Sequence, residues 1–348
     1  MITVDGSMGE GGGQLLRYSV ALAAVMGVDL RVVNIRAKRS NPGLRPQHLN
    51  AVKAIASMVS AEVEGLRVGS REIVFRPRRR PRGGRYNVDI GTAGSISLLL
   101  QALLPVLVSS DSPVELTVRG GTTVKWSPPI PYMQNVLLPL LARFGVRARI
   151  ELVRRGFYPR GGGVVRVRAE PSKITAARIL PFREIREIRG VSYVGNLPRH
   201  IAERQARSAS NYIKERGYGG YLREIAIDDK TPAIGQGTGI VVWAVSDQGV
   251  AGGDSLGERG KRAEVVGREA AERLVKALDA GSAIDDHALD NLVIYMALAR
   301  GESEVYAPEM TSHAETAIEL CKTITGAEFT VRKQGRGVAV RARGSGLS

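Results

Sequence analysis

The chain has 348 residues, of which 43% are hydrophobic and 24% charged. A chain of this length and composition can bury about two hydrophobic cores, which excludes a disulfide-stabilised mini-protein and a wholly disordered tail. Lys and Arg number 50 against 34 Asp and Glu, a formal net charge of +16, which favours a polyanionic partner such as a nucleic acid, although a basic surface adapted to heat gives the same balance.

The sequence contains no segment that predicts a membrane span or a secretory leader. The longest apolar run, residues 96–108, is interrupted by polar residues and is shorter than the roughly 20 residues that cross a bilayer. Asp5 and Glu10 stand where a leader would carry positive charge, and Arg17 interrupts the apolar stretch behind them. The single Cys321 excludes an intramolecular disulfide and a multi-cysteine zinc site. We therefore expect a cytoplasmic protein.

In chain order, the predicted elements repeat one β-α-β-α-β-β unit. The first copy comprises strand 1–5, helix 13–26, strand 29–36, helix 46–60 and two short strands within 62–75. A basic link over 76–85 is followed by strand 86–90, helix 95–108, strand 113–118, helix 132–144 and strands 147–153 and 163–169. This order predicts an α/β (α+β) fold with helices packed on mixed sheets.

A third copy is interrupted by an insertion. We expect its first strand within 179–188, and the rest as helix 286–299, strand 303–307, helix 312–325 and strands 328–333 and 337–342. Between them lie strand 191–195, helix 201–216, strands 221–227 and 239–245, and helix 263–280. The predicted domains are a large domain of three repeats, residues 1–186 and 280–348, and a smaller α/β domain, residues 187–279, inserted into it.

A glycine-rich segment, residues 9–17, follows the first strand and opens the first helix. Glycines let the backbone approach an anion, and a helix N-terminus adds N–H groups and positive charge. Glu10 could hold a divalent metal beside phosphates, and Arg17 could pair with a phosphate. The segment fits neither G-x-G-x-x-G nor a P-loop, so a tight turn with a solvated glutamate stays open. The glycine run 235–239 also fails the dinucleotide pattern, which disfavours a nicotinamide enzyme.

A basic loop over residues 36–48 follows the second strand. It carries four cations and two amides at the start of a helix, a composition suited to holding nucleic-acid phosphates. A solvated basic loop is the alternative. The further basic run 76–82 is better explained as a linker.

His313 has the most suggestive context of the four histidines. Residues 308–312 lead into a helix for which Ser312 is the expected N-cap. His313 then lies in the first turn, where the positive helix end disfavours imidazolium and favours a neutral, nucleophilic ring. Asp290, in the preceding helix, could orient it. Cys321 lies on an apolar helical face and is expected in the core.

Several motifs extend this pattern along the chain. They are 5–14 (DGxxGEGGGQ), Arg36, 42–44 (PGL), 47–49 (QHL), 91–95 (GxAGS), 120–122 (GGT), 127–129 (SPP), 156–163 (GFYPxGGG), 198–200 (PRH) and His313. Together they resemble the RNA 3′-terminal-phosphate cyclase family, in order and over essentially the whole chain. The resemblance implies three β-α-β-α-β-β units with an inserted smaller domain.

For chemistry, the resemblance implies a three-step reaction that uses ATP and a divalent metal, Mg or Mn. A histidine attacks the α-phosphate and becomes adenylylated with loss of pyrophosphate. AMP then passes to an RNA 3′-phosphate, and the neighbouring 2′-hydroxyl displaces AMP to close a 2′,3′-cyclic phosphate. Covalent catalysis of this kind divides one difficult activation into easier displacements.

The resemblance also implies roles for single residues. His313 would be the nucleophile and Glu10 the metal ligand. The ATP contacts would be Gln101, Pro128 near the adenine, Gln14, Arg17 and the segment His287, Ala288, Leu289, Asp290 and Asn291. The RNA phosphates would be held by Arg36, Arg39 and Gln47. The sequence departs from the family's usual residues at His287, Asn291 and Pro131, which affects the details of the nucleotide pocket.

The implied partners are an RNA with a 3′-phosphate end and a nucleotide, and no membrane partner is expected. The oligomeric state stays open, and a homodimer is one alternative. A non-catalytic relative that acts in ribosome assembly and rRNA processing is the alternative, but that branch typically lacks the histidine. An enolpyruvyl transferase of related repeat architecture would explain neither the His313 segment nor the charge.

Overall fold

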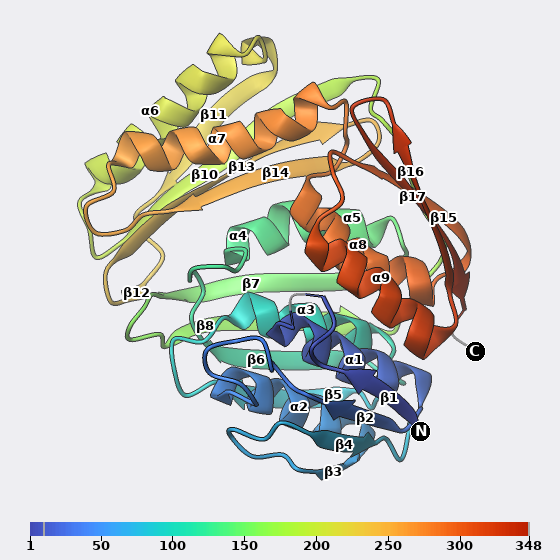
Figure 1. Ribbon diagram of the computed structural model, residues 1–348. Helices are drawn as coiled ribbons and strands as arrows, with labels where there is room; N and C mark the ends of the chain where they lie inside the picture. The colour runs from blue at the N-terminus through green and yellow to red at the C-terminus, as the bar shows by residue number, and fades with distance from the viewer. Residues whose placement is uncertain (10, 347–348) are drawn as a thin grey trace.

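The computed structural model describes residues 1–9 and 11–346, and its elements repeat one unit three times (Figure 1). The first unit comprises β1 (Ile2–Asp5), α1 (Gly13–Met26), β2 (Leu30–Val33), α2 (Pro46–Val59), β3 (Glu62–Glu64) and β4 (Ile73–Arg76). Its sheet has the order β1-β2-β4-β3. β1 and β2 are parallel, which requires a crossover such as α1, whereas the other pairs are antiparallel.

The other two units have the same topology. The second comprises β5 (Gly84–Asp89), α3 (Ile96–Val108), β6 (Val114–Gly120), α4 (Ile130–Tyr132), η1 (Met133–Leu137), α5 (Leu138–Ala142), β7 (Arg147–Gly156) and β8 (Gly163–Glu170). The third comprises β9 (Arg178–Ile179), α8 (Asp286–Leu298), β15 (Arg300–Ala307), α9 (Ser312–Thr325), β16 (Glu328–Gln334) and β17 (Gly337–Ser345). The four strands of these units run β5-β6-β8-β7 and β9-β15-β17-β16, and among them only the first pair of each unit is parallel. The predicted fold class and repeat are therefore confirmed.

The single helix predicted over 132–144 is wrong in detail, because the structure divides it into α4, η1 and α5. Pro139 lacks the N–H that would bond to the carbonyl of Asn135 in a continuous α-helix. The chain forms a π-turn instead, in which Leu138 N–H donates to the Met133 carbonyl. The wider turn accommodates the proline without ending the helical segment.

The insertion forms a four-stranded sheet with two helices. It comprises β10 (Ile185–Gly195), α6 (Arg199–Glu215), η2 (Gly219–Tyr221), β11 (Leu222–Asp228), β12 (Ala233–Ile234), β13 (Gly237–Ser246), β14 (Val250–Leu256) and α7 (Ala263–Asp279). The sheet order is β11-β10-β13-β14, and α6 and α7 cover its face away from the repeats (Figure 1). This domain has a hydrophobic cluster of its own between Ile185 and Leu278. The domain limits predicted above remain a proposal, which this separate cluster supports.

Two strands of the insertion were not predicted. β14 contains Gly252 and Gly253, which weaken a strand pattern. A Cβ at Gly253 would lie 2.1 Å from the Ala270 carbonyl of α7, so the close helix excludes a side chain there. β12 has only two residues and pairs with β7 of the second repeat. The first strand of the third repeat is also shorter than expected, since Ile185 already belongs to β10.

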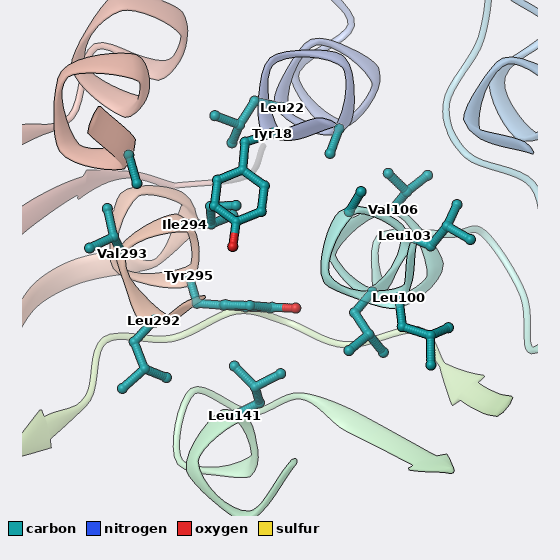
Figure 2. Close-up of a cluster of buried hydrophobic side chains, with 14 of the residues drawn as sticks. Tyr18, Leu22, Leu100, Leu103, Val106, Leu141, Leu292, Val293, Ile294 and Tyr295 are labelled. Atoms are coloured by element: carbon teal, nitrogen blue, oxygen red, sulfur yellow. The ribbon is translucent and has the colours of Figure 1, made fainter. Parts of the chain in front are cut away.

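The first helix of each repeat packs in one central core. Figure 2 shows Tyr18 and Leu22 of α1, Leu100 and Leu103 of α3, and Tyr295 of α8 converging there. No helix of the described residues is long and apolar enough to cross a membrane.

The three repeats meet in a cyclic pattern that positions the candidate site. At the start of its first helix, each repeat contacts the second helix of the preceding repeat, with the first repeat contacting the third. These contacts are Gly9 with Thr316, Gly94 with Gln47, and Asp285 with Tyr132. The loops that precede the helices are thereby gathered between the repeats.

Candidate active site

His313 lies in the first turn of α9 and is partly exposed. The predicted N-cap, Ser312, is wrong by one residue. Thr311 has the extended backbone of a cap, and its hydroxyl oxygen accepts a hydrogen bond from Ala314 N–H at 2.9 Å. Ser and Thr are both favoured N-cap residues, with Ser somewhat preferred, so the sequence alone pointed to Ser312.

Asp290 decides between them, because the Thr311 hydroxyl donates to its Oδ1. The other carboxylate oxygen lies 4.0 Å from Nδ1 of His287. Burial raises the pKa of Asp290 to about 7, against the opposing effects of Thr311 and His287. Asp290 therefore fixes the start of the helix that carries His313.

The glycine-rich loop passes between α9 and the basic loop. Gly9 has a φ of 57°, a backbone conformation that favours glycine, and a Cβ there would lie 2.1 Å from Thr316 Oγ1. Thr316 is three residues after His313 and so lies on the same side of α9. On the other side, Lys38 Nζ donates to the Gly9 carbonyl at 2.9 Å. The loop thus brings backbone atoms close to both the histidine helix and a cation.

Two polar side chains of α1, behind this loop, have buried atoms without hydrogen-bond partners among the described residues. Gln14 Oε1 and Arg17 Nε have no hydrogen-bond partner among the residues described. Arg17 is 5% exposed, and within residues 1–9 and 11–346 no carboxylate pairs with it. Burial lowers its pKa to about 10. A buried cation without a counter-charge is unfavourable, and a phosphate would supply the missing charge and acceptors.

His48 completes the wall of this site, although sequence reasoning did not select it. A Cβ at Gly13 would lie 2.1 Å from His48 Nε2 and 3.0 Å from Arg17 Nη1, so the three residues are in contact. His48 Nδ1 accepts a hydrogen bond from Arg45 N–H at 3.2 Å. Burial, followed by Arg17, Arg36 and Arg45, lowers the pKa of His48 to about 3. The ring is therefore neutral, and Nε2 carries its proton. Its place inside the run 36–48 was the available signal.

The basic loop is held by one of its own arginines. Arg36 has a φ of 55° and donates from Nη1 to the carbonyls of Asn41 at 2.6 Å and Gly43 at 3.1 Å. Arg39 is exposed, and its Nη2 would lie 3.1 Å from a Cβ added to Gly12. Arg39 therefore extends over the glycine loop, whereas part of the Arg36 guanidinium already supports the backbone.

The remaining predicted residues lie on the helices around this centre. Gln47 is partly buried on α2, Gln101 is partly buried on α3, which packs against α1, and Pro128 lies in the loop before α4. Glu10 lies outside the described residues. Among the residues that are described, no three His, Cys, Asp or Glu side chains come together as a metal site.

The predicted segment 287–291 forms the first turns of α8. His287 is exposed, while Ala288 and Leu289 are fully buried in the core. Asn291 Nδ2 donates to the His287 carbonyl at 2.8 Å, and its Oδ1 lies 3.5 Å from the Tyr18 hydroxyl of α1. In this segment a bound nucleotide could therefore meet the side chain of His287 but not those of Ala288 and Leu289.

Comparison with known proteins gives a consistent picture. A family model described as RNA 3′-terminal phosphate cyclase matches residues 8–331. Curated proteins named RNA 3′-terminal phosphate cyclase include one from Pyrobaculum neutrophilum, 48% identical over 99% of this chain and 99% of its own. Another, from Hyperthermus butylicus, is 50% identical over 97% of this chain and 95% of its own.

One solved structure, the enolpyruvyl transferase NikO from Streptomyces tendae, aligns with 96% of this chain and 47% of its own at 12% identity. Its TM-score of 0.42 is too low to support a conclusion.

Proposed function

Because this chain belongs to the RNA 3′-terminal phosphate cyclase family, we propose that it uses ATP to convert an RNA 3′-phosphate into a 2′,3′-cyclic phosphate, with His313 as the nucleophile. One observation carries the assignment of the site. The helix that begins beside His313 contacts the glycine loop through Thr316, and behind this loop Arg17 is buried with no carboxylate partner among the described residues. A triphosphate would satisfy that cation and would present its α-phosphate to the histidine.

In the first step, an imidazole nitrogen of His313 attacks the α-phosphorus of ATP. An N–P bond forms, and the bond to pyrophosphate breaks. The positive end of α9 attracts the oxygens of the phosphate under attack. In this proposal Arg17 and the backbone of the glycine loop hold the departing negative charge.

In the second step, an oxygen of the RNA 3′-phosphate attacks the adenylyl phosphorus, and the N–P bond to His313 breaks. The neighbouring 2′-hydroxyl then attacks the phosphorus of the activated 3′-phosphate and loses its proton to solvent, and the anhydride bond to AMP breaks. Arg36, Arg39 and Gln47 are the proposed ligands of the RNA phosphates. Because the ring closure needs a 2′-hydroxyl, a DNA 3′-phosphate cannot complete the reaction.

A divalent cation, Mg or Mn, belongs to the proposal, with Glu10 as its protein ligand. The described residues around the glycine loop are mainly cations and amides, and no carboxylate cluster suited to a protein-only metal site occurs in the described chain. Magnesium is commonly bound by one or two carboxylates together with substrate phosphates. Such a cation would neutralise part of the negative charge of the phosphates. The positive charges of Arg17 and Lys38 would neutralise a further part.

The direct test is transfer of label from ATP labelled in the α-phosphate. Wild-type protein should become labelled through an acid-labile bond, and His313→Ala should lose both the label and cyclisation while keeping its thermal unfolding transition. Thr323→Ala, on the exposed side of the same helix, is the matched control and should retain both activities. A folded His313→Ala protein with full cyclase activity would remove His313 from the mechanism. An unlabelled wild-type protein would favour the non-catalytic relative.

A further inference from the structure

Two exposed aromatic side chains take no part in the site described above. Trp126 is 93% exposed and Tyr158 is 77% exposed, and they are the most exposed aromatic side chains of the described chain. Large aromatic rings that stay in water commonly mark a binding surface. Trp126 also has a φ of 58°, a rare conformation for a bulky residue that is often found at functional positions.

Both residues lie on loops that are joined to each other. Trp126 is in the loop from β6 to α4, and Tyr158 is in the loop from β7 to β8. Thr123 and Phe157 form a bridge between the two loops, and Thr122 N–H donates to the Gly156 carbonyl at 2.9 Å. The two loops therefore form one hydrogen-bonded platform, and both exposed residues extend from it.

This platform continues into the predicted phosphate site. A Cβ at Gly161, three residues after Tyr158, would lie 2.8 Å from the Ala93 Cα. In the same loop, a Cβ at Gly94 would lie 3.4 Å from the Cβ of Gln47. Only the short loop 91–95 thus separates the aromatic platform from Gln47, which we propose as a ligand of the RNA phosphates.

The charge beside the rings favours a polyanion. Arg160 is exposed and, in the described part of the chain, pairs with no carboxylate. Lys125 lies 6.0 Å from the centre of the Trp126 ring, and its ion pair with Glu258 at 2.7 Å is exposed, so that pair is weak. Proteins bind unpaired nucleotides with flat aromatic rings that lie beside cations, because every base has a face for stacking.

We propose that Trp126 and Tyr158, with Arg160, bind by stacking the unpaired nucleotides that precede the terminal phosphate of the RNA. This inference rests on the proposed function, because it extends the same RNA site. It makes the enzyme selective for 3′ ends that are single-stranded over several nucleotides. A 3′ end paired to its last base would keep its bases inside the duplex and could not stack on the platform.

The kinetic test compares RNA 3′-phosphates of two lengths, a dinucleotide and a single strand of about ten nucleotides. Trp126→Ala and Tyr158→Ala should each raise KM for the longer RNA by roughly 5- to 150-fold, the usual effect of losing one stacked base. KM for the dinucleotide and the rate of self-adenylylation should not change. Trp126→Phe and Tyr158→Phe, which keep an aromatic ring, should keep KM for the longer RNA close to the wild-type value. Tyr221→Ala, an exposed tyrosine of the insertion, is the matched control.

A binding test avoids both the chemistry and the alanine variants. The chain has two tryptophans, so Trp243→Phe leaves Trp126 as the sole reporter. A single-stranded RNA with a 3′-hydroxyl should quench its fluorescence saturably, with an affinity that falls as salt rises. The same sequence in a blunt duplex should not.

Other outcomes overturn the proposal. Equal increases in KM for both RNA lengths would place the rings at the terminal nucleotide, and slower self-adenylylation would assign Trp126 to ATP. A single strand that leaves Trp126 unquenched would reserve this surface for another partner, such as a protein. Failure of the proposed function is distinguishable, because wild-type protein would then not become labelled by ATP even if the RNA quenched Trp126.

Discussion

Replacing Arg17 with methionine is expected to stabilise the unliganded protein and to weaken its binding of ATP. The guanidinium is 5% exposed and lacks a carboxylate partner in the described structure, and burial lowers its pKa from 12.5 to about 10. At ~1.4 kcal/mol for each pKa unit, holding this charge costs about 3 kcal/mol. Methionine has a similar length and no charge, so the free energy of unfolding should rise by up to about 3 kcal/mol. ATP binding should lose about 1.5–3 kcal/mol, the usual strength of a charge-assisted hydrogen bond.

The assay is thermal and urea unfolding with and without ATP, compared between the wild-type protein, Arg17→Met and the exposed control Arg332→Met. For Arg17→Met we expect a higher midpoint of unfolding than wild type without ATP. When ATP is added, we expect the midpoint to increase less than it does for the wild-type protein. Arg332→Met should change neither quantity. A lower midpoint without ATP, together with an unchanged ATP effect, would show that Arg17 supports the fold and not the nucleotide, and would refute the argument from its missing partner.

Two further predictions concern the RNA and the histidine helix. Arg39→Ala should slow the chase of enzyme-bound AMP into 3′-phosphorylated RNA by roughly 10- to 100-fold and affect self-adenylylation less; equal losses in both rates would assign Arg39 to ATP. Asp290 has a folded-state pKa of about 7 against an ordinary value of 3.8, so its stabilising contribution is complete below about pH 4 and is lost as the pH rises through 7. Asp290→Asn should therefore flatten the fall in the free energy of unfolding between about pH 4 and 7, measured by urea titration at each pH; parallel curves for the two proteins would contradict the raised pKa.

The repeat was predictable because its signal is local. Apolar periodicity, turn residues and the order of elements recur along the chain, and these depend on neighbours in sequence. The errors occur where tertiary contacts decide. β14 is a strand although two glycines interrupt its pattern, because α7 packs closely against Gly253. β12 exists only through its pairing with β7, a partner that lies far away in the sequence.

The sequence allowed us to predict which types of residue form the candidate site, but not the contacts between repeats that bring these residues together. The glycine loop, the basic loop and His313 each have a pattern that indicates phosphate chemistry. Their meeting depends on contacts between repeats, such as Gly9 with Thr316, which no spacing in the sequence reveals. His48 was missed for the same reason, since a histidine gains its low pKa only from burial and from the cations that the fold brings around it.

The symmetry of the fold brings together the loops to which we assign the different parts of the proposed reaction. The loop after the second strand of each repeat occupies the same position in its unit, since β1 with β2, β5 with β6 and β9 with β15 are parallel pairs that end at equivalent edges. In the first repeat this loop is the basic loop, in the second it carries Trp126 and Pro128, and in the third it leads to His313. Residues on separate loops should act almost independently, whereas pairs in direct contact across the repeats should be coupled. Gly9 with Thr316 and Gly94 with Gln47 are the pairs through which a change at one loop would reach the next.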